Sequence, residues 1–199
     1  MLTMEEAEAL GIALLDKYGL KPDHAKHVER LAMRLFDGAR ECGWVSESSR
    51  SLLAFAAFAH DIGHYIDEEE HHAHGAYLLM HDAALKALDD RTREAAAWLV
   101  RNHRKRKLLD EHRFRGKERE ATGRLAVLLR LADALDYEHR QEAAVRIAAA
   151  GADGCFEVHV EGYDLRKYER KMGKKLAFAP EFGFERIRVV DGSGAAAEY

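Results

Sequence analysis

An almost unbroken apolar run, LLAFAAFA over residues 52–59, ends directly in a histidine and an aspartate, His60 and Asp61. A helix that is apolar on every side must be enclosed by other elements. The run therefore predicts a central helix that carries two ionisable side chains into the interior. Buried ionisable groups are costly unless they are paired or bind a metal, so this junction is the first candidate for a functional site.

Helices that surround this run are predicted over the rest of the first 144 residues. Thr3 and Glu6 stand at the spacing of a capping box and open a helix that ends at Tyr18-Gly19. Apolar residues at helical spacing and strong helix formers predict further helices over residues 22–43, 71–88, 91–103 and 123–141. Between residues 101 and 120, nine Lys or Arg stand against four Asp or Glu, and we interpret that segment as a basic loop.

A different pattern begins near residue 145. Two alternating segments, 145–151 and 155–162, flank the turn sequence GADG and predict a hairpin, followed by a helix over 164–178 and a closing strand over 184–192. We therefore expect a mainly α fold, with a helical domain over residues 1–144 and a small β-β-α-β extension over residues 145–199. The edge of that sheet is a candidate surface for a homodimer.

The overall charge and the cysteine content narrow the class of protein. A net charge of −4 argues against a protein dedicated to binding nucleic acid or an anionic membrane. Cys42 and Cys155 are far apart and match neither a disulfide framework nor a zinc motif. The N-terminal sequence MLTMEEAEAL is acidic, and no apolar run is long enough to cross a bilayer. We therefore expect a cytoplasmic protein that does not span a membrane.

Histidines are unusually frequent, since the chain has twelve and five of them fall within residues 60–74. Two others extend the apolar face of the helix predicted over residues 22–43. His24 lies four residues before Val28, and His27 lies four before Leu31. Periodicity does not choose between the two. A single inward histidine is most often a hydrogen-bonded core residue, so either one alone is weak evidence for a site.

Asp133 brings a second carboxylate to an inner helix face, because it follows Leu129 by four residues. Two alternatives stay open: Asp133 pairs with Arg130, or Asp136 rather than Asp133 is the inward residue. With the His60-Asp61 pair and an inward histidine, ligands from three helices converge. Neutral imidazoles beside carboxylates suit a divalent transition metal better than calcium or magnesium. We expect one or two such ions, with Mn, Ni, Fe, Co and Zn as candidates.

Five motifs recur as a set between about residues 20 and 140: HAKHVERLAMRLFD, AHDIGHYID, HHAHGAYLL, RNHRK and LLRLADALD. Together they resemble the HD-domain metal-dependent phosphohydrolases. They are most similar to the C-terminal HD module of the exopolyphosphatase and guanosine pentaphosphate phosphohydrolase (Ppx/GppA) family, and the C-terminal extension looks similar too. The resemblance implies an HD-domain helical bundle that hydrolyses a phosphomonoester or phosphoanhydride, with a nucleotide or polyphosphate-like substrate.

The resemblance also implies a ligand for each place in the metal site. The set is His24, His60, Asp61 and Asp133, with His72 and His103 added in members that bind two ions. The family motif thereby selects His24 over His27, a choice that periodicity leaves open. It does not decide which of His71, His72 and His74 takes the additional place.

Candidate catalytic and substrate-binding residues surround these ligands. Asp61 is a candidate proton acceptor if it faces the attacking water. His64, one turn after His60, either contacts substrate phosphate or is a histidine favoured at a helix C-terminus by the dipole. Three basic residues lie near His103 in the sequence: Arg101, Arg104 and Lys105. They either hold phosphate oxygens or form a solvated face.

We expect a metal-dependent phosphohydrolase whose partner is a phosphorylated small molecule or polyphosphate. The alternative is a non-catalytic regulatory HD module that binds metal and a nucleotide or polyphosphate without turnover. A third class is a helical interaction domain without a metal. The long polyphosphate-hydrolysing members carry actin-like domains ahead of this module, which this sequence does not contain, so we do not expect their polyphosphatase activity to transfer.

Overall fold

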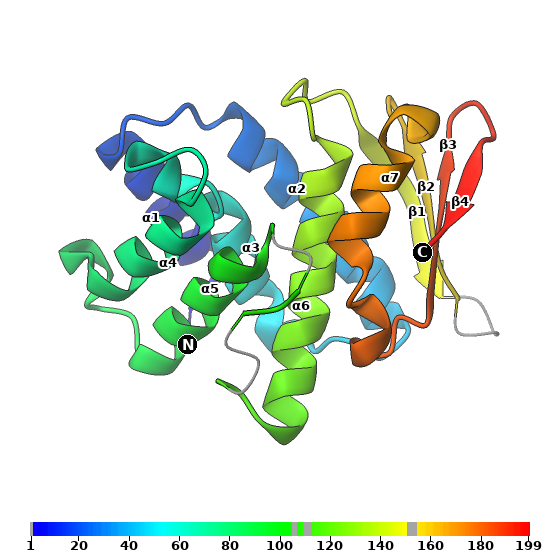
Figure 1. Ribbon diagram of the computed structural model, residues 1–199. Coiled ribbons are helices and arrows are strands. Elements are labelled where there is room, and N and C mark those ends of the chain that lie inside the picture. The colour runs from blue at the N-terminus through cyan, green and yellow to red at the C-terminus, as the bar shows by residue number, and fades with distance from the viewer. Residues whose placement is uncertain (1, 105–106, 110–112, 151–154) are drawn as a thin grey trace.

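The computed structural model describes residues 2–104, 107–109, 113–150 and 155–199, and it confirms the mainly α fold (Figure 1). The elements follow one another along the chain as α1 (Met4–Lys17), α2 (Asp23–Glu41), η1 (Glu47–Ser49), α3 (Arg50–Ala59), η2 (Ile62–Tyr65), α4 (His71–His81), η3 (Ala83–Leu85), α5 (Asp90–Asn102), α6 (Gly116–Leu135), β1 (Ala144–Ala150), β2 (Cys155–Glu161), α7 (Leu165–Leu176), η4 (Ala179–Phe182), β3 (Arg186–Asp191) and β4 (Ala196–Glu198). The labels η denote single 3-10 turns.

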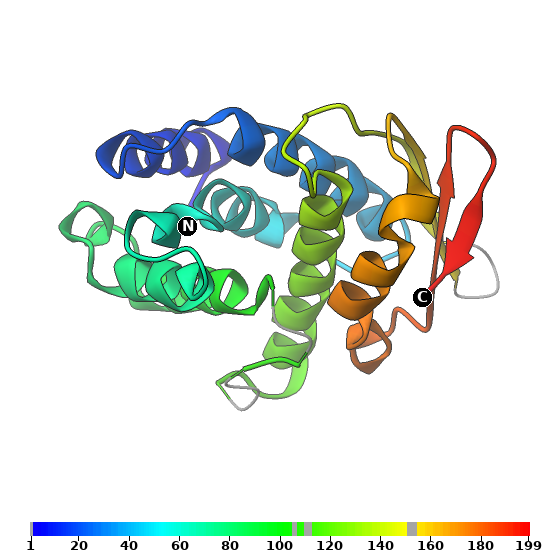
Figure 2. The same ribbon diagram turned by 45° about the horizontal axis from the view of Figure 1, so that its top comes forward.

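The helix α3 occupies the centre of the helical layer, as its apolar run predicts. Phe55, Phe58 and the alanines around them are buried, and α1, α2, α5 and α6 all contact this helix. Figure 2 shows α3 between α2 on one side and α4 and α5 on the other. The ionisable pair at its C-terminal end therefore faces the interior.

Two helices end earlier than their apolar periodicity predicts. The helix predicted over residues 71–88 stops at His81, because Asp82 is extended and its side chain accepts a hydrogen bond from the Ala84 amide at 2.8 Å, which starts η3. The helix predicted over residues 123–141 stops at Leu135, because the Asp136 carboxylate accepts from the Gln141 amide at 2.8 Å and closes a loop. Polar side chains thus end both helices before their pattern does.

The N-terminal part of α6 corrects the basic-loop interpretation. This helix begins at Gly116, so residues 116–120 of the predicted loop are helical. Gly116 has a φ of +55°, which glycine adopts without strain. Its conformation turns the chain into the helix just after Arg115.

The C-terminal sheet has the strand order β1-β2-β3-β4. β1 and β2 form the predicted antiparallel hairpin, and β3 pairs with β2 in parallel. Parallel pairing requires a crossover, which α7 provides. The predicted β-β-α-β order is confirmed, and the short β4, whose alanine-rich sequence carries little strand signal, adds an antiparallel edge that the sequence does not predict.

The sheet and the helices share one core. A Cβ at Gly38 of α2 would lie 1.9 Å from the carbonyl oxygen of Ala148 in β1, so glycine permits this close contact. One cluster of buried residues includes Leu35 of α2, Leu129 of α6 and Phe156 of β2. The predicted division at residues 144–145 therefore falls between elements that pack together, and two-part organisation stays a prediction.

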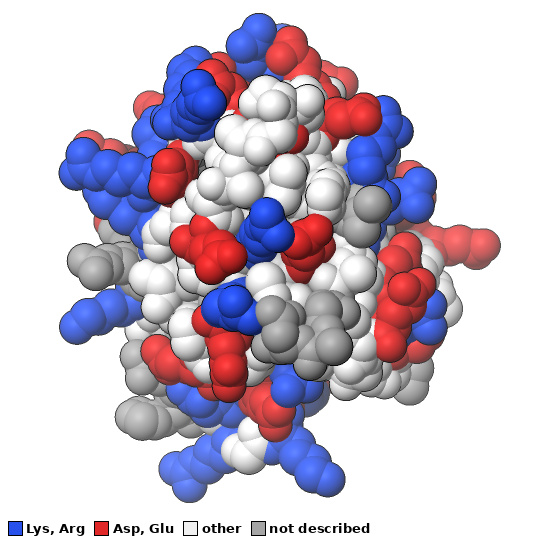
Figure 3. Space-filling view, turned by 90° about the vertical axis from the view of Figure 1, so that its right-hand side faces the viewer, with Lys and Arg blue, Asp and Glu red and all other residues white. Residues whose placement is uncertain are grey.

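The outer surface on the sheet side carries both signs of charge (Figure 3). Lys and Arg side chains are interspersed with Asp and Glu. Between neighbouring strands, Nη1 of Arg188 in β3 lies 3.1 Å from Oε2 of Glu157 in β2. This arrangement leaves no field of a single sign on the face that the figure shows. Within the described ranges, none of the helices combines the length and apolarity that a membrane span requires.

Candidate metal centre

Ligand atoms from three helices meet at the end of α3. His24 from the first turn of α2, His60 after α3 and Asp133 from the last turn of α6 have ligand atoms within 4.8 Å of one another. The Nε2 atoms of His24 and His60 lie 3.2 Å apart. His27 is buried elsewhere on α2, with its Nδ1 3.1 Å from Arg30. The geometry thus groups His24, and not His27, with the predicted ligands.

Asp61 lies between two groups of imidazoles. Its Oδ2 is 3.3 Å from Nε2 of His60 and 3.6 Å from Nε2 of His24. Its other oxygen, Oδ1, faces a second group of Nε2 atoms, those of His71 at 3.4 Å, His64 at 3.6 Å and His103 at 3.7 Å. One carboxylate therefore joins two potential ion positions.

The rings are held by their other nitrogen, Nδ1, which lies within hydrogen-bond distance of an acceptor. The acceptors are Asp136 Oδ2 for His24 at 2.7 Å, Ala57 O for His60 at 2.7 Å, Glu68 O for His71 at 2.7 Å, and Val100 O for His103 at 2.6 Å. An Nδ1–H that donates to such an acceptor leaves Nε2 of the neutral ring free as a lone-pair donor. Metal-binding histidines are oriented in this way, so the ring orientations fit a metal.

The charged groups of the cluster shift one another's pKa values. Burial opposes a charged imidazole at His60, but Asp61 and Asp133 raise its pKa to about 9. Burial likewise opposes ionisation of Asp61, but His60 holds the pKa of that carboxyl well below its ordinary value. Without a metal the cluster therefore keeps a proton on His60, which a bound ion would displace.

Two imidazoles of the second group, those of His103 and His71, favour the neutral form. Burial lowers the pKa of His103, and the positive charge of His60 lowers it further. Burial also lowers the pKa of His71. Metals bind the neutral form of imidazole, so the lowered pKa values of His103 and His71 favour the ligating state of these two rings.

The structure places His71, and not His72, in this second group. His71 Nε2 lies 3.1 Å from His103 Nε2. His72, the next residue on α4, is buried with its Nε2 3.6 Å from Glu70. Neighbouring residues on a helix point about 100° apart, so only one of the two can face the cluster. His71, rather than His72, is therefore the candidate ligand on α4.

A close contact between η2 and α4 brings His64 to His71. A Cβ at Gly63 would lie 1.9 Å from the carbonyl oxygen of His71, so glycine allows η2 to rest on the first turn of α4. The rings of His64 and His71 stack with centroids 3.9 Å apart. Glycine at position 63 thus permits the close packing of η2 on α4.

A cavity of about 390 Å³ opens onto the cluster. His64 contributes to its wall with 29% of its side chain exposed. The other polar residues in the wall are Lys21, Asp23, His24, Asp61, His139 and Gln141. Asp61 is therefore accessible to small molecules through this cavity.

His139 belongs to the site although no sequence pattern indicates it. Its ring stacks on that of His24 with centroids 3.6 Å apart, and it has a ligand atom within 4.8 Å of those of His24 and Asp61. His139 and Gln141 both have a φ near +55°, and this left-handed loop turns the two side chains toward the cavity. Their placement follows from the early end of α6, which periodicity does not predict.

Lys175 is a second residue that sequence reasoning missed. It lies on α7, and its Nζ forms an ion pair with Asp133 Oδ2. No sequence pattern indicates this role for residue 175, because the contact depends on how α7 packs against α6. The predicted alternative, a pair between Asp133 and Arg130, is therefore not the main interaction of this carboxylate. Arg130 instead donates to the carbonyls of Asn102 and Lys175.

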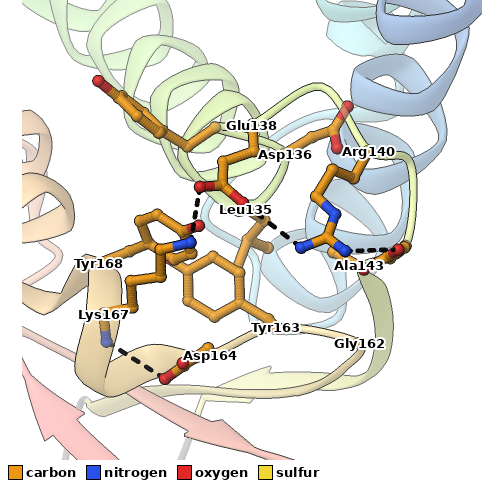
Figure 4. A pocket seen from close by; sticks show the side chains of 12 residues that line it. Leu135, Asp136, Glu138, Arg140, Ala143, Gly162, Tyr163, Asp164, Lys167 and Tyr168 are labelled. Carbon is orange, nitrogen blue, oxygen red and sulfur yellow. Dashed lines mark hydrogen bonds and ion pairs between the residues drawn. The ribbon is translucent and has the colours of Figure 1, made fainter.

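The loop after α6 lines another cavity, of about 310 Å³ (Figure 4). Asp136 lines this cavity and also accepts from His24. Its cations are paired within the wall, Lys167 with Glu138 at 2.7 Å and Arg140 with Glu138 at 3.5 Å. We therefore do not assign this cavity to phosphate.

The three predicted phosphate ligands have different positions. Arg104 lies beside the cluster, where its guanidinium donates to the carbonyls of Glu68 and Glu69 at 3.3 and 3.4 Å. Arg101 lines a separate groove between α4 and α5, together with Trp98. Lys105 lies outside the described residues. Of this set, Arg104 is thus the one that the structure places near the imidazoles.

Most of the chain matches the model of a known protein family. The model of the Ppx/GppA phosphatase, domain III, matches residues 11–161, which is 151 of the 199 residues. The match includes α2 to α6 and the loop with His139, and therefore both groups of imidazoles. It ends before α7 and Lys175.

Proposed function

The chain belongs to the Ppx/GppA phosphatase family through domain III, and on that premise we propose that it is a metal-dependent phosphohydrolase of the HD type. The proposed substrates are phosphomonoesters or phosphoanhydrides of the nucleotide or polyphosphate kind. The observation that carries the proposal is the Asp61 carboxylate, whose two oxygens face two separate groups of inward imidazoles.

The residues present fit one or two divalent transition metal ions. His24, His60, Asp133 and Oδ2 of Asp61 would hold the first ion. His71, His103 and Oδ1 of Asp61 would hold a second. Imidazole nitrogens with carboxylate oxygens are a donor set that such ions prefer.

The chemistry requires an activated water and compensation of charge on the phosphoryl group. When bound, a divalent cation supplies both, because it acidifies water and acts as a Lewis acid. Since both oxygens of Asp61 face imidazoles, we assign to Asp61 the holding of metal in place of its predicted role as proton acceptor. His64 lines the cavity 3.6 Å from Asp61, and we assign to it the transfer of a proton or the binding of a phosphate oxygen.

The test is metal-dependent release of phosphate from nucleotides, polyphosphate and guanosine tetraphosphate. We expect Asp61→Ala to lose the ions and at least about 100-fold of the activity, the scale of a catalytic group. Asp82→Asn is the matched control, because Asp82 is a buried carboxylate outside the cluster; it should keep metal and activity. Unchanged activity in Asp61→Ala would contradict the assignment.

Two outcomes would point to the other classes. Stoichiometric metal without phosphate release from any of these substrates would favour a regulatory module. Absence of metal after reconstitution with manganese, nickel or zinc would exclude both the enzyme and the metal-binding module. The metal content of the wild-type protein is therefore the first measurement.

A further inference from the structure

Lys175 brings a positive charge from the C-terminal part of the chain into the centre of the cluster. Its Nζ contacts Asp133 Oδ2, and the two side chains are only 13% and 11% exposed. The buried residues of α7, among them Met172 and Leu176, form the face that packs inward. Lys174, the preceding residue, is exposed. The inward position of Lys175 is therefore a property of the packed helix and not of a mobile surface side chain.

A buried guanidinium holds this part of α7 in place. Arg130 of α6 is fully buried and donates from Nη1 to the carbonyl oxygen of Lys175 at 3.0 Å. Its Nε donates to the carbonyl of Asn102, the residue before His103. The guanidinium also lies over the ring of Phe178, 4.2 Å from the centroid. Arg130 thus ties α7 to the end of α5, and Figure 1 shows α6 between these two helices.

Lys175 and a metal ion would share one carboxylate. Oδ2 of Asp133 contacts Lys175, whereas Oδ1 faces Nε2 of His24 at 3.8 Å and Nε2 of His60 at 4.0 Å. A divalent ion held by Oδ1 and these imidazoles would lie close to the ammonium and would repel it. The backbone of Lys175 stays fixed by Arg130, so the ammonium would remain in the site without its carboxylate. A buried charge of that kind needs a new partner.

We propose that Lys175 is a phosphate-binding residue of the metal-loaded site, and that it pairs with Asp133 only until the metal binds. A phosphoryl oxygen that enters with a divalent ion would be such a partner for the freed ammonium. This inference rests on the proposed phosphohydrolase function. Lys175 itself lies on α7, outside the segment that the family model matches.

The test separates metal binding from phosphate binding. Lys175→Met keeps the length of the side chain and removes its charge, and Lys174→Met is the control on the exposed face of the same helix. Calorimetric titration with manganese, followed by titration of the manganese-loaded protein with orthophosphate, measures both affinities. We expect Lys175→Met to bind manganese about tenfold more tightly and orthophosphate at least about tenfold more weakly, the scale of one charged hydrogen bond. Lys174→Met should match the wild type in both.

Stability without metal gives a second readout. Lys175→Met leaves Asp133 unpaired, so its melting temperature in chelator should fall and manganese should raise it by more than it raises that of the wild type. If Lys175→Met is too unstable to measure, Lys175→Gln should show the same opposite changes in manganese and orthophosphate affinity.

Three results would overturn the proposal. Unchanged orthophosphate affinity in Lys175→Met would exclude phosphate binding by Lys175, and a parallel loss of both affinities would show a purely structural role. A wild-type protein that binds no manganese would refute this inference together with the proposed function. A wild-type protein that binds manganese and orthophosphate but releases no phosphate would refute the enzyme alone, and the expected changes in Lys175→Met would then still support phosphate binding by Lys175.

Discussion

Two adjacent histidines on α4 have different surroundings, and this difference can be measured. We expect His71→Ala to lower the amount of bound metal, because Nε2 of His71 faces both His103 and Asp61. His72→Ala should lower stability, since His72 is buried, but it should leave the metal content unchanged. Elemental analysis after manganese or zinc reconstitution and dialysis decides between them. Loss of metal in His72→Ala with retention in His71→Ala would reverse the assignment.

Asp136 does not face the cluster directly, but it orients His24 through Nδ1. We expect Asp136→Asn to reduce metal affinity about 10- to 100-fold, as is usual when a residue that orients a ligand is changed. Glu138→Gln is the control, because Glu138 lies in the same loop and its carboxylate pairs with Lys167. Competition titration with a metallochromic chelator measures both affinities. Equal affinities in the two variants would show that His24 needs no such support.

Some site residues can be predicted from patterns in the sequence, whereas others depend on contacts between segments. Periodicity places Asp133 on an inner face, and the motif resemblance selects His24 over His27. The choice between His71 and His72 requires the rotation of α4 about its axis, which its apolar pattern does not determine. His139 and Lys175 depend on a left-handed loop and on a contact between α6 and α7, so no local pattern in the sequence indicates them.

Between elements, the contact of η2 with α4 should be sensitive to a single methyl group. Gly63→Ala places a Cβ against the carbonyl of His71, so we expect η2 and α4 to separate at a cost of about 1–3 kcal/mol. Because His64 and His71 move with these elements, the variant should also bind less metal. Gly173→Ala is the control, since its Cβ would make only ordinary contact with Tyr199. Thermal denaturation and metal content together test the expectation, and a Gly63→Ala variant as stable as the control would contradict it.

Asp82 joins α1 to the start of η3, and its contribution should depend on pH. Its carboxylate accepts from Lys17 Nζ at 2.7 Å and from the Tyr18 hydroxyl at 2.6 Å. Burial opposes its ionisation, but these partners lower its pKa below 3.8. A lowered pKa in the folded state stabilises the protein above the unfolded value, and this stabilisation disappears as the pH falls through the folded value.

We therefore expect Asp82→Asn to reduce the free energy of unfolding by about 1–3 kcal/mol at neutral pH. The difference from the wild type should be complete above about pH 5 and should shrink in acid, below the ordinary pKa. Urea denaturation of both proteins at several pH values measures it. A difference that is constant down to pH 3 would show that the charge of Asp82 is not the cause.

The ends of the elements were harder to predict than their existence. Apolar spacing located the helices correctly, but α4 and α6 stop where Asp82 and Asp136 hydrogen-bond to backbone amides just beyond them. Such side-chain bonds compete with the helix wherever an aspartate occurs, and the apolar pattern cannot show which of these bonds will form.

For the whole molecule, the main question is whether the C-terminal extension is an independent part. The order of strands and helix in it follows from the sequence, but its packing does not. The contact at Gly38 and the shared core mean that the sheet covers α2, and Lys175 completes the surroundings of Asp133. We therefore infer that the helical part and the extension unfold together.

The two tryptophans of the chain allow a direct test, because each reports on one part. Trp44 packs on Phe184 of the C-terminal part, with ring centroids 4.7 Å apart, and Trp98 packs on Phe114 at 5.8 Å. In Trp98→Phe the fluorescence reports the sheet side, and in Trp44→Phe it reports the helical side. In each variant we expect the fluorescence transition in urea to coincide with that of far-UV circular dichroism, as in two-state unfolding. An earlier fluorescence transition in Trp98→Phe alone would show that the extension melts first, and the metal centre would then lose Lys175 before its imidazoles separate.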